Sequence, residues 1–184
     1  MKFASTEIPE VRLITRVRLD DARGAFSEIY RQDQFERHGI QTRFVQDNHS
    51  LSKHAGTLRG LHYQRPPMAQ EKLVTVLRGR ILDVAVDLRT TSPTFGKHVA
   101  IKLSATNGSQ LFIPAGFAHG FVTLAPDTEV FYKVSEYYAP ELEAGIRWDD
   151  PDLAIDWQLE QAPILSTRDQ SLPLLKDSSD NFFY

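Results

Sequence analysis

Cysteine is absent from the 184-residue chain. Without a thiol there is no disulfide, no iron–sulfur cluster, no thiolate-bound zinc and no cysteine nucleophile, and nothing indicates an oxidising compartment. The first ten residues, MKFASTEIPE, contain acidic residues and no long apolar core, so they do not resemble a secretory signal. No stretch approaches the roughly 20 apolar residues that a membrane-spanning helix needs. We therefore expect a soluble, cytoplasmic protein with no membrane partner.

An excess of positive charge is also missing. The chain has 21 Lys and Arg against 24 Asp and Glu, a formal net charge of -3. It has no long-range positive field to attract a polyanion, so we do not expect nucleic acid as a partner, although a local basic pocket is compatible with this charge. Hydrophobic residues make up 41% of the chain, enough to bury a core, and we expect a single domain over residues 1–184.

Short apolar runs recur along the chain, and glycine, proline, serine or asparagine separates them. Runs of this kind at a spacing of about 8–12 residues are typical of an all-β sandwich, jelly roll or barrel. The expected strands are 11–17, 25–30, 44–52, 73–77, 81–88, 98–103, 110–113, 119–124 and 129–138.

Local signals predict the connections. Residues 20–24 form a turn that would join the first two expected strands into a hairpin. Asp33 is placed to cap a short helix that Gly39 would end. Residues 44–52 end in a polar cluster, where we expect the strand to pass into a loop. The segments 140–145 and 149–153 look like loops and short helical turns.

The densest group of functional side chains lies between residues 56 and 79, which contain Arg59, His62, Gln64 and Lys72. His62 and Gln64 are two positions apart, so both side chains face the same way on a strand. We interpret this stretch as a strand pair with one face lining a polar cavity.

A second segment, residues 108–121, reads GSQLFIPAGFAHGF. Together with residues 56–79 it resembles the paired motifs of the cupin superfamily, which implies a cupin-type jelly roll with a few short helices. The matching positions of the second motif are Gly108, Pro114, Gly116 and His119.

The first motif departs from the metal-binding pattern. His62 is kept, but Gln64 stands where metal cupins have a second histidine, and Lys72 stands where they have a glutamate. An ammonium group beside a divalent cation adds Coulomb repulsion and removes an anionic ligand. We therefore expect no metal, and the finer resemblance described next implies that no other cofactor is needed.

A finer resemblance covers nearly the whole chain and is to the dTDP-4-dehydrorhamnose 3,5-epimerase family. Several long matches in the same order are far more specific than a single motif. They are DARGAFSE (21–28), FVQDNHSLS (44–52), LRGLHYQ (58–64), QEKLV (70–74), DLRTTSPTFG (87–96), PAGFAHGF (114–121), YKVSEYYAP (132–140) and IRWDDP (146–151).

The resemblance implies inversion of the carbons that flank the C4 ketone of a dTDP-linked 4-keto-6-deoxy sugar. Such chemistry needs a base, an acid on the other face and positive charge near the enolate oxygen. By resemblance the base is His62, oriented by Asp169, the proton donor is Tyr132, and Lys72 lies near the C4 oxygen.

The resemblance also implies substrate contacts, and Phe26 or Tyr138 would stack on the thymine, with Tyr137 as an alternative to Tyr138. At position 168 the family commonly has lysine, and arginine keeps the charge here. The implied substrate-binding residues are Arg23, Phe26, Glu28, Gln46, Asn48, Arg59, Lys72, His119, Tyr138, Glu143 and Arg168.

Taken alone, these residues have plainer interpretations. Ser166 and Asp169 fit a helix capping box, Lys72 could pair with Glu71 in solvent, and Tyr132 belongs to an aromatic stripe of the kind that usually packs. His119 by itself is more typical of a hydrogen-bonded core or rim histidine than of a catalytic one.

Three other functions compete with a 3,5-epimerase. One is a monofunctional 3- or 5-epimerase of a related sugar nucleotide, one a non-catalytic sugar-binding cupin, and one a metal-dependent cupin. We also expect a homodimer, in which Phe26 reaches the pocket of the partner.

Overall fold

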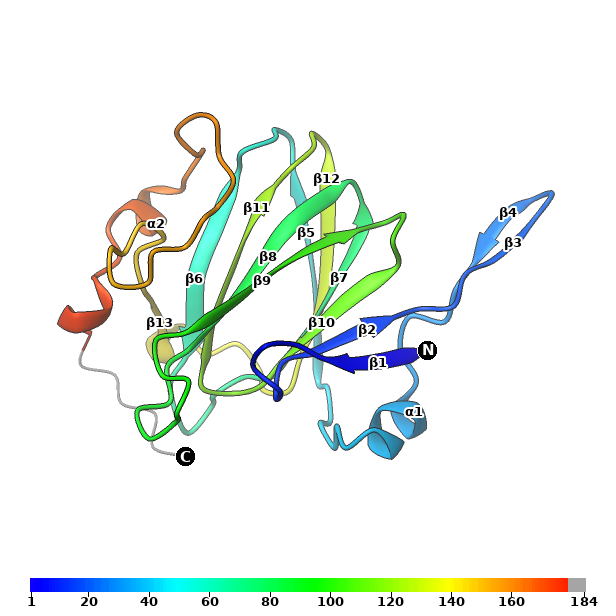
Figure 1. Cartoon of the computed structure of the whole chain (residues 1–184), viewed down its shortest axis with the longest axis horizontal. Helices are drawn as coiled ribbons and strands as arrows, with labels where there is room; N and C mark the ends of the chain where they lie inside the picture. Colours follow the sequence, from blue (N-terminus) through cyan, green and yellow to red (C-terminus); the bar gives the residue numbers. More distant parts are fainter. Residues whose placement is uncertain (179–184) are drawn as a thin grey trace.

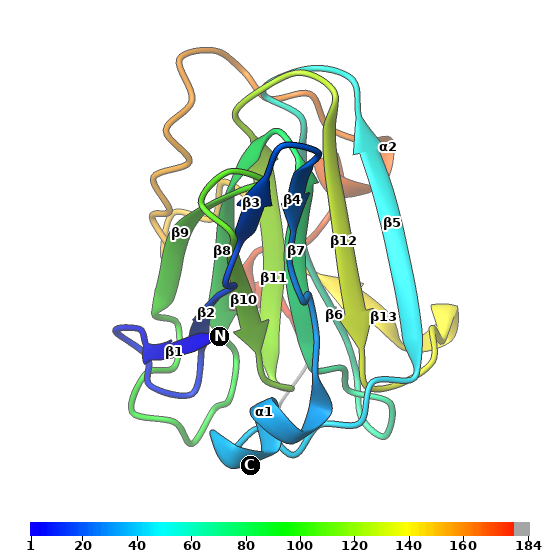
Figure 2. The ribbon, with the colours of Figure 1, turned by 90° about the vertical axis from the view of Figure 1, so that its right-hand side faces the viewer.

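Runs of β-branched and aromatic residues between turns form two antiparallel sheets that pack face to face (Figures 1 and 2). The computed structural model describes residues 1–178. The six-stranded sheet has the order β1 (Lys2–Ser5), β2 (Arg12–Thr15), β10 (Ser109–Ile113), β7 (Lys72–Arg78), β12 (Thr128–Val134) and β5 (Gln46–Ser52). The five-stranded sheet has the order β13 (Glu143–Gly145), β6 (Leu58–Gln64), β11 (Phe117–Thr123), β8 (Arg80–Asp87) and β9 (His98–Ser104). The predicted all-β, cupin-type jelly roll is confirmed.

Apolar side chains fill three layers. The first cluster lies between the sheets and includes Val74 and Leu111. The second lies on the outer face of the five-stranded sheet, where Leu153 and Trp157 cover it. The third joins the outer face of the six-stranded sheet to Phe35. Because several strands are buried on both faces, their sequences read as continuous apolar runs rather than as alternating ones.

A small hairpin projects from the body of the molecule (Figure 1). It consists of β3 (Leu19–Asp21) and β4 (Gly24–Phe26). The predicted turn at 20–24 is present, but the strands beside it are short. The expected strand 11–17 is β2, which pairs with β1 and β10 instead of with the strand after the turn.

A short helix forms where the sequence predicts one, but its first residue differs from the prediction. Helix α1 spans Gln32–Arg37, so the proposed cap at Asp33 is wrong. Asp33 lies in the first turn, where it pairs with Arg31 and Arg37. Helix α2 spans Thr167–Gln170, and the 3-10 helices η1 and η2 span Pro140–Leu142 and Leu175–Asp177. None of the helices in residues 1–178 combines the length and apolarity needed to cross a membrane.

Three other expectations need correction. Residues 46–52 stay in a strand, because β5 pairs with β12 along its whole length, polar end included. Strand β13 lies in the segment expected to be loops and turns, where it pairs with β6. The stretch 56–79 is not a strand pair, because β6 and β7 belong to different sheets.

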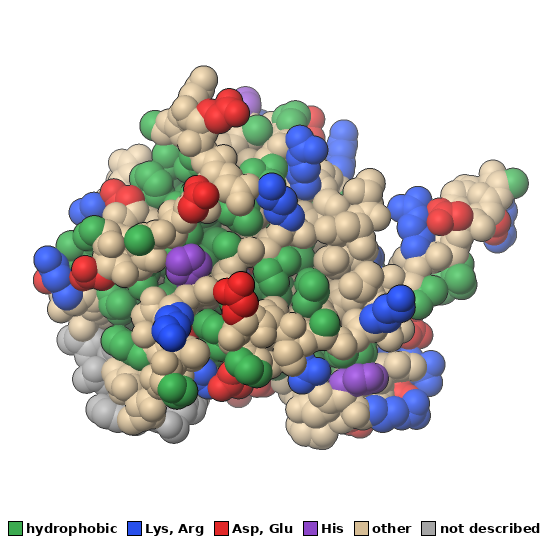
Figure 3. Space-filling model, viewed as in Figure 1, with side chains coloured by type: hydrophobic (Ala, Val, Ile, Leu, Met, Phe, Trp, Pro, Cys, Tyr) green, Lys and Arg blue, Asp and Glu red, His purple; other side chains and the backbone are tan. Residues whose placement is uncertain are grey.

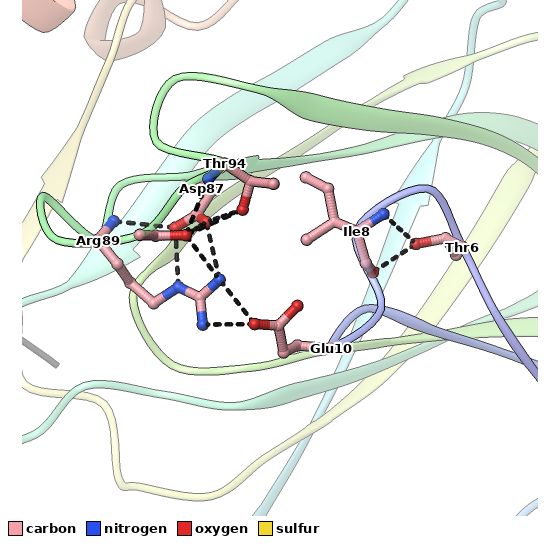
Figure 4. Close-up of polar contacts among 7 residues, drawn as sticks. Thr6, Ile8, Glu10, Asp87, Arg89 and Thr94 are labelled. Atoms are coloured by element: carbon pink, nitrogen blue, oxygen red, sulfur yellow. Dashed lines mark hydrogen bonds and ion pairs between the residues drawn. The ribbon is translucent and has the colours of Figure 1, made fainter.

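A polar network lies where β8 ends and the next loop begins (Figure 4). Asp87, fully buried at the end of β8, accepts hydrogen bonds from Arg89 Nε at 2.8 Å and from the hydroxyls of Ser92 and Thr94 at 2.6 Å each. Arg89 also reaches Glu10 at 3.2 Å. The network thus ties the loop after β8 to the N-terminal segment.

Candidate active site

A cavity of about 640 Å³ opens between the two sheets. Strands β5, β7 and β12 of the six-stranded sheet form one wall, strands β6 and β11 form the other, and residues 164–169 border it. Its size is that of an ordinary small-molecule site. The predicted residues that line it are Gln46, Asn48, Arg59, His62, Lys72, His119, Tyr132, Tyr138, Glu143, Arg168 and Asp169.

A local irregularity in β6 brings two of these residues to the same wall. Arg59 and His62 are three positions apart and would face opposite ways on a regular strand. The register between β6 and β11 shifts here, and both side chains line the cavity. The strands approach closely, since a Cβ on Gly60 would lie 2.5 Å from Gly120 Cα. Only glycine fits at this crossing.

The first histidine–aspartate pair joins β6 to α2. His62 Nε2 lies 2.6 Å from Asp169 Oδ1, and the aspartate is buried. Ser166 Oγ accepts a hydrogen bond from the Asp169 backbone nitrogen at 3.1 Å. The Ser166 half of the expected capping box and the pair are therefore both present, because the cap uses the backbone of Asp169 and the pair uses its carboxylate.

The charged form of Asp169 is favoured. Burial acts against the carboxylate, but the hydrogen bond and charge of His62, with a further bond from Ser166, outweigh it and lower the pKa of Asp169. Since Asp169 engages Nε2, proton transfer by His62 would use Nδ1.

A second histidine–aspartate pair lies deeper. His119 Nε2 is 2.8 Å from Oδ1 of the fully buried Asp83 on β8, while Asp83 Oδ2 is buried without a hydrogen-bond partner among the described residues. Burial lowers the pKa of His119, although Asp83 opposes this shift. His119 lines the cavity and is hydrogen-bonded, so it combines both of its predicted interpretations.

Lys72 is buried at the start of β7, and its Nζ donates to the backbone oxygen of His62 at 3.2 Å. It is not a solvated partner of Glu71, so that interpretation is wrong. Burial lowers the pKa of Lys72 to about 8, while the negative charges of Asp83 and Glu143 act in the opposite direction. With this pKa the ammonium stays mostly protonated at neutral pH and loses its proton under mildly alkaline conditions.

Tyr132 lines the cavity from the six-stranded sheet, across from His62. It lies on β12 beside Asn48 of β5. Burial is the main cause that raises the pKa of Tyr132, with Arg59 acting against the shift and Glu143 adding to it. The phenol therefore keeps its proton at neutral pH.

Ion pairs and hydrogen bonds connect the residues at the mouth. Arg168 forms an ion pair with Glu143, which also accepts a hydrogen bond from the hydroxyl of Tyr138 at 2.6 Å. Gln46 Nε2 donates to Asn48 Oδ1 at 3.0 Å. Tyr137 borders a different hollow, so Tyr138 is the member of this tyrosine pair that faces the cavity.

Three predicted substrate contacts lie away from the cavity of their own chain. Arg23 is paired with Asp21 at the tip of the hairpin, Phe26 is 69% exposed, and Glu28 is exposed just beyond β4. Figure 3 shows charged side chains of both signs on this projecting hairpin. A single chain does not bring these residues to the site.

The sequence interpretation missed Asp83 and the binding partners of Gln64. Asp83 carried a signal, since it is a charged residue inside the apolar run ILDVAV. Gln64 lines the cavity, but its amide binds backbone groups of two loops. Within residues 1–178, no three His, Asp or Glu side chains are arranged as a metal site. The absence of a metal in the working protein stays a prediction.

Comparisons with known proteins identify the family. The family model described as dTDP-4-dehydrorhamnose 3,5-epimerase matches residues 5–177. The chain belongs to this family. A dTDP-4-dehydrorhamnose 3,5-epimerase of Sinorhizobium fredii is 48% identical over 100% of this chain and 94% of its own length. The predicted family and its enzyme class, an isomerase, are thus confirmed.

Solved structures of the family have the same fold. The dTDP-6-deoxy-D-glucose-3,5-epimerase of Legionella pneumophila, in complex with dTDP-4-keto-L-rhamnose, is similar with a TM-score of 0.92 at 46% identity, covering 96% of this chain and 93% of the other. A 3'-monoepimerase of Streptomyces bikiniensis, in complex with dTDP-quinovose, has a TM-score of 0.87 at 34% identity, covering 94% and 87%.

Proposed function

We propose that the protein epimerises a dTDP-4-keto-6-deoxy sugar at C3 and C5 without a cofactor. The observation that carries this proposal is the placement of His62 and Tyr132 on opposite sheets of one cavity, with buried Lys72 beside them. A base and an acid that approach a carbon from opposite faces can invert it. The names and bound sugars of the relatives support the same substrate class.

The steps balance without an added reactant. His62 takes the proton from the carbon next to the ketone, and the electrons of the C–H bond move into an enolate. The positive charge of Lys72 stabilises the enolate oxygen. Tyr132 then gives its proton to the opposite face of the carbon. Exchange with solvent removes the extra proton from His62 and restores the phenol, and repetition at the second carbon completes the reaction.

Basic side chains at the mouth suit the diphosphate of the substrate. Arg59 and Arg168 both line the cavity, and guanidinium groups bind phosphate oxygens in a bidentate manner. In the free protein Arg168 is paired with Glu143, so the substrate would have to compete with that carboxylate.

A homodimer would complete the site. Arg23, Phe26 and Glu28 lie outside the cavity of their own chain, and exposed Phe26 is a large apolar surface on a projecting hairpin. We infer that the hairpin of one chain reaches the cavity of its partner. Analytical ultracentrifugation together with activity tests this, because a fully active monomer would contradict it.

The direct test is incubation with dTDP-4-keto-6-deoxyglucose in deuterated water, with deuterium at C3 and C5 read by NMR. Label at both carbons supports the 3,5-epimerase. Label at one carbon supports a monofunctional enzyme like the Streptomyces bikiniensis relative, and label at neither contradicts the proposed function. Tyr132→Phe should slow net inversion more than exchange, because it removes the donor and leaves the base.

Metal analysis of active protein is the companion test. We expect full activity after treatment with a chelator, since the amide of Gln64 is engaged by backbone groups and Lys72 is a cation. Stoichiometric iron, manganese or zinc that activity requires would contradict the cofactor-free mechanism.

A further inference from the structure

The segment 136–139 is held by side chains from other strands and loops. Gln64 makes the most contacts with it. Its Nε2 donates to the backbone oxygens of Tyr137 at 3.0 Å and Met68 at 2.6 Å, and its Oε1 accepts from the backbone nitrogen of Ala139 at 2.9 Å. Both amide hydrogens of this buried glutamine are therefore engaged by the backbone.

Two more glutamines bind the same segment. Gln46 Oε1 accepts from the backbone nitrogen of Tyr138 at 3.0 Å. Gln70 Nε2 donates to the backbone oxygen of Glu136 at 2.9 Å. We call Gln46, Gln64 and Gln70 the glutamine clamp. Its members come from β5, from β6 and from the loop before β7, so both sheets hold the segment.

The clamp acts on both peptide groups that flank Tyr138. The group before it is held at the oxygen of residue 137 and the nitrogen of residue 138, and the group after it at the nitrogen of residue 139. The orientations of these two groups set the φ and ψ of Tyr138 and hence the direction of its side chain. The neighbouring tyrosines consequently face different hollows.

Tyr138 depends on this support because about half of the residue faces solvent. It is 53% exposed, and its side-chain polar contacts are those of the hydroxyl with Glu143 and Arg168 at the mouth of the cavity. An aromatic ring in such a place is useful to a ligand only if its direction is fixed before binding, since ordering it on binding would cost affinity.

We propose that Gln64 and Gln70 are positioning residues that hold Tyr138 toward the cavity, and that they thereby strengthen binding of the nucleotide part of the substrate. This inference rests on the proposed function and on the role that the family resemblance implies for Tyr138, in which its ring contacts the base. Gln64 occupies the position of a metal-ligating histidine in metal cupins, and the clamp gives that position a different use.

The primary experiment measures dTDP binding by calorimetry for Gln64→Met. This change keeps the length of the side chain and removes the bonds to both sides of Tyr138. We expect dTDP to bind roughly tenfold more weakly, as the loss of about one net hydrogen bond to an ordered element would give. KM should rise by more than kcat falls. Unchanged affinity would overturn the proposal.

Gln110→Met is the matched control. Gln110 is also a fully buried glutamine, but its Nε2 donates to Thr75 Oγ1 at 2.6 Å, and it does not line the cavity. Both variants should lose some thermal stability, whereas only the Gln64 variant should lose dTDP affinity. Equal losses of affinity would contradict a specific role for the clamp.

A double-mutant cycle with Tyr138→Ala shows whether Gln64 acts through the tyrosine. Once the ring is gone, Gln64→Met should no longer change dTDP affinity, and a full additive loss would contradict the proposal. Gln70 is partly buried, and Gln70→Met removes one hydrogen bond. This change should weaken dTDP binding about twofold to fivefold. It takes the place of Gln64→Met if the Gln64 variant does not fold. A wild-type protein that fails to bind dTDP would instead overturn the proposed function itself.

Discussion

The two histidine–aspartate pairs of the cavity are chemically alike and differ in access. The side chain of His62 is 29% exposed and that of His119 is 9% exposed. Asp169 is anchored by Ser166 through its backbone, whereas Asp83 is fully buried, and one of its oxygens has no hydrogen-bond partner within residues 1–178. His62 therefore has more of the exposure to solvent that a base needs to take up and release protons.

The buried pair is better suited to supply charge. Asp83 acts electrostatically on Lys72 and helps to keep that buried ammonium protonated. Its hydrogen bond also fixes His119 with Nε2 toward the carboxylate. We interpret His62–Asp169 as the pair that transfers protons and Asp83–His119 as the pair that maintains the electrostatic field for Lys72.

The largest difference should appear between His62→Asn and His119→Asn. Loss of the base should reduce kcat by roughly 10³-fold or more, within the range for general acid–base groups. Loss of His119 should cost on the order of tenfold, because it contacts substrate without taking its proton. Product formation followed by NMR checks both, and equal losses would remove the distinction between the pairs.

Asp169→Asn should have the next largest effect, a loss of kcat of roughly 10²-fold. The amide no longer stabilises the imidazolium and can hold the wrong tautomer of His62. Ser166→Ala is the control, since it removes the cap of α2 and keeps the carboxylate. If Ser166→Ala reduced kcat as much as Asp169→Asn, the aspartate would matter only as part of the helix.

Asp83→Asn should act through the pH profile. In the proposed mechanism activity requires charged Lys72, whose pKa is about 8, so the rate should fall as the pH rises through that value. Removing the charge of Asp83 removes an influence that raises this pKa, so the alkaline limb should move to lower pH. A profile of kcat against pH measures the shift, and an unmoved limb would contradict the role given to the buried pair.

Asp87→Ala should leave the activity of folded molecules nearly unchanged and lower the free energy of unfolding by about 3 kcal/mol, because it breaks a buried ion pair outside the cavity. Burial opposes the charge of Asp87, but bonds from Arg89, Ser92 and Thr94 lower its pKa. The stabilisation is therefore present above the ordinary pKa near 3.8 and lost as the pH falls through the lowered value. Urea unfolding at several pH values tests this.

Much of the fold could be predicted because apolar runs and turn residues act locally. Strands β7 to β11 follow those runs closely, whereas β12 ends at Val134, short of the expected end at residue 138. The strand expected over 44–52 is present as β5, but its polar end could not be recognised as strand, since its pairing with β12 depends on residues about 80 positions away. The same holds for β6 and β7, whose sequences do not reveal that they belong to opposite sheets.

The candidate site, too, could be predicted only in part. Motifs predicted His62, Lys72 and Tyr132, and the structure brings these side chains to one cavity, while their roles stay predictions. The clamp by Gln64 was not predictable, because its backbone partners lie in two loops, one of them more than 70 residues away. In the proposed dimer the placement of Phe26 would depend on a second chain, which no single-chain pattern describes.

The most direct test of the difference between the two pairs is solvent exchange, measured side by side in His62→Asn and His119→Asn. Each variant is incubated with dTDP-4-keto-6-deoxyglucose in deuterated water, and label at C3 and C5 is followed by NMR. If His62 is the base, the His62 variant should show no exchange above background at either carbon, and the His119 variant should still exchange at both. Exchange at the wild-type rate in His62→Asn would contradict the role of His62 as the base. So would a loss of exchange in His119→Asn alone.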